Sequence, residues 1–225
     1  GSASDNAAYW SIATTMQSDN SALSTVRDAL NLGSATIDTA NAGLTASKDL
    51  VNQIKTKLVA ATQPGVDRTK VQDEIGQLQK QLKSVADSAS FSGQNWLSVD
   101  SAAANYNATR SIVASFTRDA ASAVSIQTID VDVSKTALFD VNGPAGIVDK
   151  DRTVGTTTAA VYTMDISALT DSTADLATLS DYVKIADQAF NEIVAASSSL
   201  GAAKARVSTQ QAFVSSLSDA ITKGV

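Results

Sequence analysis

Residues 9–58 read YWSIATTMQSDNSALSTVRDALNLGSATIDTANAGLTASKDLVNQIKTKL, and this stretch decides the fold class. Alternating spacings of three and four residues between apolar positions are the heptad pattern of a coiled coil, in which a narrow apolar seam faces a partner helix. The spacing predicts a helix over 9–62, roughly 80 Å long. Every seventh residue is apolar: Tyr9, Met16, Leu23, Leu30, Ile37, Leu44, Val51 and Leu58.

The second column of this heptad lies three residues further along and consists mostly of smaller residues. Gly33 and Ala40 belong to it, and Gly43 also lies inside the helical pattern. A glycine inside a helix costs about 1 kcal/mol relative to alanine, so we interpret Gly33 and Gly43 as positions of close packing. Because most helical stability in proteins comes from packing an apolar face, another part of the chain must lie beside this helix.

A second heptad near the other end of the sequence supplies the partner. One column of it is apolar throughout: Leu179, Ala186, Ile193, Leu200, Val207, Val214 and Ile221. Its companion column begins with apolar residues and then becomes polar at Ser197, Lys204, Gln211 and Ser218. We expect the two helices to pack side by side, with the polar column forming a groove open to solvent or to neighbouring molecules.

The chain between the two heptads contains a further helix and a β-rich region. Gln63-Pro64-Gly65 ends the first helix, and Asp67 then begins an amphipathic helix antiparallel to it. Between residues 109 and 133 apolar and polar residues alternate around a turn at 119–122, which predicts a β-hairpin. A further short strand is predicted over 161–166, and Ser4-Asp5-Asn6 is a candidate cap for the first helix.

These elements predict a mainly α protein with a small β-rich insert, an α+β fold. We expect an elongated, coiled-coil-like bundle of the two long helices, joined by the shorter helix and the hairpin. Residues 1–98 and 172–225 would form a discontinuous helical domain. Residues 99–171 would form a small β-rich domain inserted at the far end of the bundle.

Composition excludes several classes of function. The 225-residue chain has a formal net charge of −6, without a basic stripe, so it is a poor candidate for binding nucleic acid or an anionic membrane. It contains no Cys and no His, which removes disulfides, Ser-His-Asp and Cys-His catalysis, and His-based zinc sites. We expect no catalytic residue, metal or cofactor. No apolar run is long enough to span a membrane, and no signal peptide is visible. We interpret Gly1-Ser2 as a remnant of an expression tag, which would make the chain a fragment whose natural ends are missing.

Two kinds of residue invite a functional interpretation, although a structural one is favoured for each. The pairs Asp130/Asp132 and Asp149/Asp151 could bind Ca²⁺ or act as acid and base if they lie on one face of a strand. No EF-hand spacing is present, and a solvated strand face is the preferred interpretation. Trp10 and Trp96 could stack on sugars, but we expect packing anchors. Residues 143–146, GPAG, form a turn and not a phosphate loop.

Several motifs in order along the chain resemble those of bacterial flagellins. Residues 3–8, followed by Ile12-Ala13 and Met16, resemble the family pattern SAKDDAAGLAIA…M. Residues 71–75 (VQDEI) and 91–94 (FSGQ) resemble IQAEI and FNG, and Ser199–Ala202 with Arg206-Val207 resembles SQLGA…NRF. The variants Tyr9-Trp10-Ser11 and Asn95-Trp96-Leu97 are similar to those of short α-proteobacterial flagellins. The resemblance covers residues 3–97 and about 176–223.

This resemblance implies a structural subunit of the flagellar filament, located outside the cell and used for swimming motility. In the family, the helical ends stack into the filament wall and the variable region faces outward. The implied partners are further copies of the chain, paralogous flagellins, and the flagellar export chaperone and cap. The resemblance also implies export through the flagellar channel without a cleaved signal peptide, and a fragment that lacks the innermost terminal helices.

The family also carries a patch recognised by the flagellin-sensing Toll-like receptor. Matched residue by residue, the receptor-contact Arg, Leu and Glu of the family fall on Gln53, Lys57 and Glu74. Two of the three residues differ, and Lys57 places a charge where an apolar side chain packs. We therefore expect weak recognition or none, and hence evasion of flagellin sensing.

Two rival functions remain open at this point. The first is a cell-surface adhesin that binds polysaccharide through aromatic residues of the β-rich region, where Tyr106, Phe116, Phe139 and Tyr162 are available. The second is a hydrolytic insert, which the absence of His makes the weakest candidate.

Overall fold

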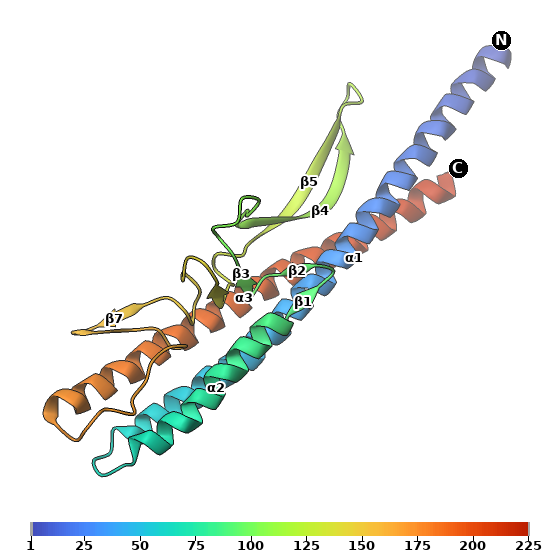
Figure 1. Ribbon diagram of the computed structural model, residues 1–225. Helices are drawn as coiled ribbons and strands as arrows, with labels where there is room; N and C mark the ends of the chain where they lie inside the picture. The colour runs from blue at the N-terminus through green and yellow to red at the C-terminus, as the bar shows by residue number, and fades with distance from the viewer. Residues whose placement is uncertain (1, 225) are drawn as a thin grey trace. The chain divides into compact units, whose positions relative to one another are not determined.

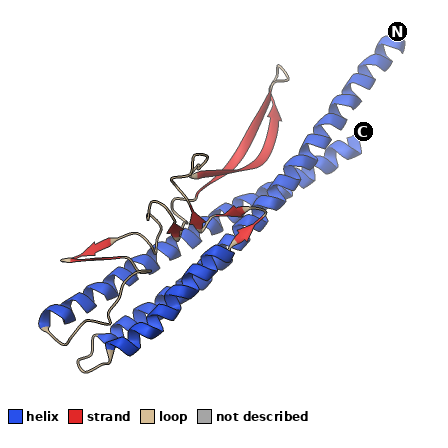
Figure 2. Ribbon diagram, in the orientation of Figure 1, coloured by secondary structure: helices blue, strands red, loops and turns tan. Residues whose placement is uncertain are grey.

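Helices dominate this protein, as Figures 1 and 2 show. The structure, a computed structural model, describes residues 2–224; the side chains of residues 2–6, 8, 9, 11, 12 and 224 are not described. The long helices are α1 (Ser2–Ala61), α2 (Arg68–Ser88) and α3 (Thr173–Gly224). Short strands fill much of the region between α2 and α3. The expected mainly α fold with a small β-rich insert is confirmed.

The chain divides into two compact units, and each is described by itself. The first unit comprises residues 1–37, 110–131 and 202–225, and the second comprises residues 38–109 and 132–201. Both units therefore contain part of α1 and part of α3. The sequence-based boundaries near residues 98 and 172 describe a different division, which stays a prediction.

In the first unit, a β-hairpin packs against α1. Its strands are β4 (Thr109–Arg118) and β5 (Val124–Asp132), and Asp119 forms the turn between them by accepting hydrogen bonds from the amides of Ala121 and Ala123 at 2.8 and 2.9 Å. The predicted hairpin and its turn are thus confirmed. A Cβ placed on Gly33 would lie 2.6 Å from Cγ2 of Ile112, so the missing side chain makes room for the hairpin.

In the second unit, α2 lies beside the later part of α1 (Figure 1). Asp67 caps α2 as expected, since its Oδ1 accepts a hydrogen bond of 3.2 Å from the amide of Lys70. A Cβ on Gly43 would lie 2.4 Å from Cδ1 of Leu97, so the interpretation of Gly33 and Gly43 as close-packing positions is confirmed.

The second unit also contains three pairs of very short strands. The strands β1 (Ser90–Phe91) and β2 (Gln94–Asn95) are antiparallel, as are β7 (Arg152–Val154) and β8 (Thr157–Ala159). The strands β3 (Ser98–Val99) and β6 (Phe139–Asp140) pair in parallel, although forty residues separate them in sequence. Sequence periodicity did not predict any of these strands, because two or three residues carry no detectable period.

The strand predicted over 161–166 is wrong, because this segment forms turns and loop. The amide of Met164 donates to the carbonyl of Ala160 at 2.9 Å, which is a local turn and not a strand ladder. A side chain of α2 binds further backbone groups of this segment: Gln79 donates to the carbonyls of Val161 and Met164. The apolar residues that suggested a strand are nevertheless buried.

The helix seam is buried in both units. Most members of the two apolar columns are enclosed: Leu23, Leu30, Ile37, Leu44, Val51, Leu58, Leu179, Ala186, Ile193, Leu200, Val207 and Val214. Met16 and Ile221, which belong to the same columns, are half-buried. Tyr9, the first member of the column, lies outside the described side chains. The expected cap at Ser4-Asp5-Asn6 lies inside α1, which already begins at Ser2.

The polar column of α3 does not form an open groove, so this prediction is wrong. Each of its side chains hydrogen-bonds to a polar side chain of α1, in the antiparallel order that places the two helices side by side. In the second unit the pair is Ser197–Asn41 at 2.7 Å. In the first unit the pairs are Lys204–Ser34 at 2.6 Å, Gln211–Asn31 at 2.8 Å and Ser218–Asn20 at 2.7 Å.

Candidate functional site

The three residues that the resemblance assigns to a receptor patch, Gln53, Lys57 and Glu74, lie on the α1–α2 helical hairpin of the second unit. Gln53 is exposed on α1, one turn before Lys57. The Nζ of Lys57 lies 3.1 Å from Oε2 of Glu74 on α2, so two of the three positions form an ion pair with each other. Both side chains are more than two-fifths exposed, so the pair contributes little to stability. The pair places two opposite charges next to each other on the surface of the helical hairpin.

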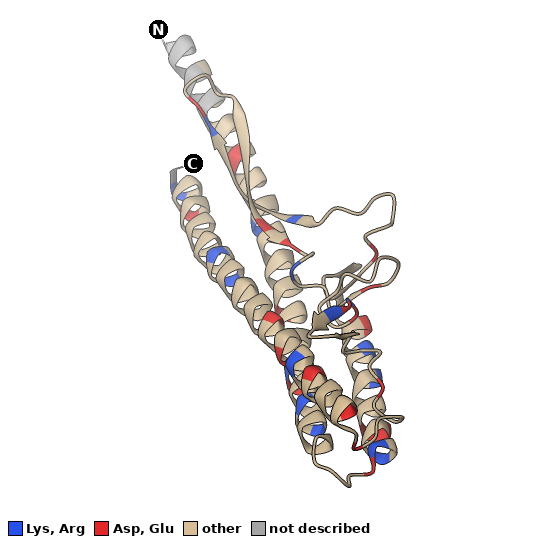
Figure 3. Cartoon of the chain, turned by 90° about the vertical axis from the view of Figure 1, so that its left-hand side faces the viewer, with Lys and Arg blue, Asp and Glu red and all other residues tan. Residues whose placement is uncertain are grey.

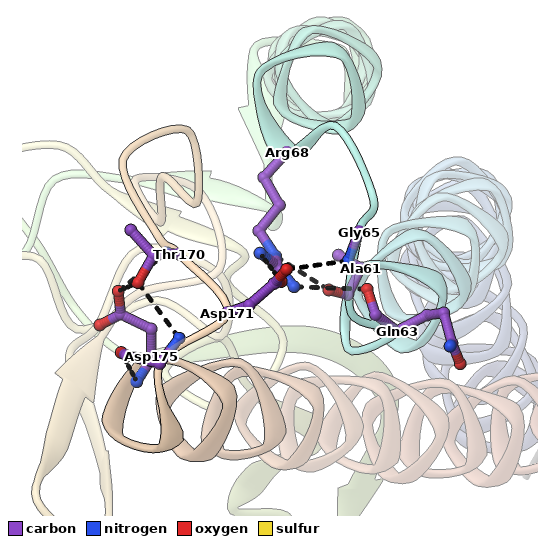
Figure 4. A network of polar contacts seen from close by, with 8 residues as sticks. Ala61, Gln63, Gly65, Arg68, Thr170, Asp171 and Asp175 are labelled. Atoms are coloured by element: carbon purple, nitrogen blue, oxygen red, sulfur yellow. Dashed lines mark hydrogen bonds and ion pairs between the residues drawn. The ribbon is translucent and has the colours of Figure 1, made fainter.

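The end of this helical hairpin is held by Arg68, a residue that sequence analysis missed (Figure 4). Its side chain is only 4% exposed. Nε donates to the carbonyl of Ala61 at 3.0 Å, and Nη2 lies 3.4 Å from the carbonyl of Gln63. These carbonyls are at the C-terminus of α1, where a cation is favoured by the helix dipole. Arg68 therefore caps α1 from the first residue of α2.

Asp171, in the loop before α3, connects a third segment to this cap. Its Oδ1 accepts from Nη1 of Arg68 at 2.8 Å, and its Oδ2 accepts from the amide of Gly65 at 3.0 Å. These two hydrogen bonds lower the pKa of the Asp171 carboxyl below its ordinary value. One carboxylate thus ties the α1–α2 turn to the chain that enters α3.

The start of α3 is capped next to this contact. Ser172 Oγ accepts a hydrogen bond of 3.1 Å from the amide of Asp175, as an N-cap residue does. Asp175 in turn accepts two hydrogen bonds of 2.8 Å, from the amide and the hydroxyl of Thr170, and these lower its pKa. Local capping therefore fixes the loop that carries Asp171.

A second charged cluster surrounds Glu192 on α3. Arg152 binds its carboxylate through two nitrogens at 3.0 and 2.6 Å, and Lys150 adds a contact of 3.0 Å. Burial opposes ionisation of Glu192, but the hydrogen bonds from Arg152 and Lys150 outweigh it and lower the pKa. A cavity of about 330 Å³ lies beside the cluster, lined also by Lys135 and Ser199. Because two cations already neutralise Glu192, we interpret the cluster as a structural contact that holds β7 against α3.

Both carboxylate pairs singled out in the sequence take part in local hydrogen bonds. Asp130 is exposed and accepts hydrogen bonds from Ser111 and Thr128, which lower its pKa. Asp149 lies in a turn and not in a strand, where it accepts from the amides of Asp140 and Gly146. Throughout the described part of the chain, no group of three or more acidic residues is arranged to hold a metal ion.

The aromatic residues considered for sugar binding differ in exposure. Trp96 is buried, as expected of a packing anchor, whereas Trp10 is 70% exposed and anchors nothing within the described structure. Phe139 is buried and meets the ring of Tyr162 edge-on at 4.9 Å. Tyr106 and Phe116 are half-buried. Within residues 2–224, no helix is both long and apolar enough to cross a membrane.

Comparison with known proteins identifies the relatives of this chain. Residues 1–102 match the family described as the bacterial flagellin N-terminal helical region. Flagellin C of Rhizobium meliloti (strain 1021) is 44% identical over 239 residues, which cover 99% of this chain and 74% of that protein. A flagellin of Brucella melitensis biotype 1 is 34% identical over 228 residues, covering 99% of this chain and 70% of that protein. Flagellin A of the same Rhizobium strain is 55% identical over 151 residues, but these span only 38% of its length.

Proposed function

Because this chain belongs to the bacterial flagellin family, we propose that it is a structural subunit of the bacterial flagellar filament. The observation that carries the proposal is the 44% identity to Flagellin C across 99% of the chain. The proposal assigns the protein to the outside of the cell, with no catalytic role. Its partners would be further copies of itself, paralogous flagellins, and an export chaperone and filament cap.

The mechanism that we propose is self-assembly by packing of stiff subunits. Buried apolar columns such as Leu30 with Leu44 on α1 and Leu200 with Val207 on α3 hold each unit in one conformation. A subunit that needs no rearrangement loses little conformational freedom when it joins a polymer, so weak contacts between outer faces suffice. The polar pairs between α1 and α3 support this mechanism because they fix how the helices face each other.

Filament formation by the intact protein tests this function. Cells that lack the gene should show shorter or missing filaments by electron microscopy and reduced spreading in soft agar, and restoring the gene should reverse both defects. The purified intact protein should also elongate filament seeds. If it stays monomeric on seeds that a related flagellin elongates, the proposal is wrong.

We also propose that this flagellin is poorly recognised by the flagellin-sensing Toll-like receptor. The ion pair between Lys57 and Glu74 supports this, because a receptor would have to separate or bury the paired charges. A reporter assay should show a weak response to the intact protein, and the double substitution Gln53→Arg with Lys57→Leu should increase it. Lys80→Leu, on the exposed side of α2, is the matched control. A parental response as strong as that to an enterobacterial flagellin would contradict the proposal.

A further inference from the structure

Asn142 is the only asparagine of the sequence that a glycine follows, and it lies in an exposed turn of the second unit. The amide of Gly143 donates to the carbonyl of Asp140 at 3.4 Å. This hydrogen bond is longer than the usual range of about 2.7–3.2 Å, so the amide nitrogen is weakly held. Pro144 has no amide hydrogen to donate. Residues 141–145 are all exposed, so water reaches the turn.

The side chain of Asn142 joins this turn, which follows β6, to the loop that follows β3. Its Nδ2 donates a hydrogen bond of 2.7 Å to Oδ2 of Asp100. The other oxygen of Asp100 accepts from the amide of Ala102 at 3.1 Å. The contact between the two segments therefore depends on a hydrogen that Asn142 supplies. An ionised carboxylate at position 142 would have no hydrogen to donate.

Carboxylates already surround the turn. Next to Asp100 in sequence, Ser101 donates from its amide and its hydroxyl to the carboxylate of Asp140, a residue that is only 3% exposed. Asp149 accepts a hydrogen bond of 2.7 Å from the amide of Asp140. Burial raises the pKa of the Asp149 carboxyl, and the charge of Asp140 acts in the same direction. Figure 3 shows that acidic residues, drawn red, occur in the loops as well as on the helices. A further negative charge is therefore unfavourable here.

We propose that Asn142 is a site of spontaneous deamidation. The amide nitrogen of Gly143 attacks Cγ of Asn142 and gives up its proton, the bond from Cγ to Nδ2 breaks, and ammonia leaves a cyclic succinimide. Water then opens the ring and produces aspartate or isoaspartate, so the net reaction exchanges an amide and water for a carboxyl group and ammonia. Attack within one chain is favoured over attack by a separate molecule, and glycine has no Cβ that would obstruct the approach of its nitrogen.

The product breaks the contact between the two segments. The Nδ2 donor is lost, and a carboxylate takes its place against Oδ2 of Asp100, which lay only 2.7 Å away. Like charges at so short a distance repel each other. Isoaspartate also lengthens the main chain by a carbon atom. Because the reaction needs only water and releases ammonia, it runs in one direction, and the fraction of molecules with a separated turn rises with the age of the protein.

The test incubates the purified protein at mildly alkaline pH, where the attacking amide loses its proton more readily. Peptide mapping by mass spectrometry measures the converted fraction of Asn142, and an isoaspartate methyltransferase assay detects isoaspartate. Asn107 is the internal control, since it is exposed in the same unit but precedes Ala108. Gly143→Ala is the matched variant: φ at position 143 is not positive, and the new Cβ would lie 3.1 Å from Oγ of Ser101, so only a small shift is needed. Circular dichroism verifies that the variant folds.

Asn142 should convert about tenfold or more faster than Asn107, and Gly143→Ala should slow its conversion about tenfold. Equal rates at Asn142 and Asn107 would overturn the inference. Conversion as fast in Gly143→Ala as in the parent, or aspartate without any isoaspartate, would show that the nitrogen of Gly143 is not the attacking group, and the inference would fail in either case.

Substitutions test the structural consequence separately. Asn142→Asp, which equals one of the products, should lower the melting temperature at neutral pH by about 2 °C or more. Asn142→Ala removes the donor without adding a charge and should lower it less. In the control Asn107→Asp, the oxygen that accepts from the amide of Thr109 at 3.0 Å is retained, so the change should be less than about 1 °C. If Asn142→Asp melts like the parent or like Asn142→Ala, repulsion does not separate the segments and this part of the inference is wrong.

Discussion

Nζ of Lys204 on α3 donates a hydrogen bond of 2.6 Å to Oγ of Ser34 on α1. Lys204 occupies a seam position that an apolar residue would fill in a simple coiled coil. Polar residues at such positions reduce stability but specify one arrangement of the helices. In the first unit, the α1–α3 contact therefore combines an apolar column with a column of hydrogen-bonded pairs.

The Lys204–Ser34 pair should be measurable by a double-mutant cycle. Lys204→Ala is expected to reduce the free energy of unfolding by about 1 kcal/mol, because it leaves Ser34 without this donor. The coupling energy with Ser34→Ala should be about 0.5–1.5 kcal/mol. Lys80→Ala on the exposed face of α2 is the control. A coupling energy of zero would mean that the pair does not form in solution.

Leu30→Asp should destabilise the protein by several kcal/mol, because it buries an unpaired charge at a position with no exposed surface. Leu32→Asp, two residues further along α1, replaces a leucine that is 47% exposed and should change stability by less than about 1 kcal/mol. Chemical denaturation gives both values. If the Leu30→Asp variant unfolds like the parent, the seam assignment is wrong.

Gly33→Ala should reduce stability by about 1–3 kcal/mol, because the new methyl group would meet three carbons of Ile112 closer than 3.0 Å. At Gly201 the new Cβ of alanine would meet no neighbouring heavy atom within 4 Å. It should instead stabilise α3 by about 0.5–1 kcal/mol, since alanine favours a helix interior. The melting temperatures of the two variants should thus shift in opposite directions. A shift in the same direction would contradict the close contact between position 33 and Ile112.

Arg68→Met should reduce the free energy of unfolding by about 2 kcal/mol, because the buried carbonyl of Ala61 loses its donor. Lys70→Met, in the same turn of α2 but exposed, should change it by less than about 0.5 kcal/mol. Equal effects of the two substitutions would show that Arg68 does not cap α1.

Stability should depend on pH through Asp171. The folded-state pKa of its carboxyl is lowered, so the unfolded chain binds the proton more tightly. The contribution is complete above the unfolded pKa, near pH 4, and is lost as pH falls through the folded pKa. Chemical denaturation from about pH 6 to pH 2 should show that Asp171→Asn reduces the free energy of unfolding at pH 6 and leaves it unchanged at pH 2. In an Arg68→Met background, the effect of Asp171→Asn on the free energy of unfolding should depend less on pH. If that pH dependence is unchanged, a group other than Arg68 lowers the pKa of Asp171.

The sequence predicted the features that follow from spacing within one element. The burial of Leu30 and Leu200 was predicted from the heptad. The cap at Asp67 was predicted from its position before an amphipathic segment. The hairpin around Asp119 followed from alternation in two neighbouring segments. Each of these inferences required only residues that are close in sequence.

Features that depend on distant residues could not be predicted. Arg68 caps α1 and also binds Asp171, about a hundred residues later, through another nitrogen of its guanidinium group. The polar column of α3 looked solvent-exposed because its partners on α1 are recognisable only after the two helices are aligned. The apolar run at 161–166 looked like a strand because nothing in it reveals that Gln79 would satisfy its carbonyls.

The close approach of Ile112 to Gly33 has a mechanical consequence. Ile112 fills the volume that a side chain at position 33 would occupy, so the hairpin cannot slide along α1 without first lifting out of that recess. A torque applied to α1 would therefore act on the hairpin through this contact.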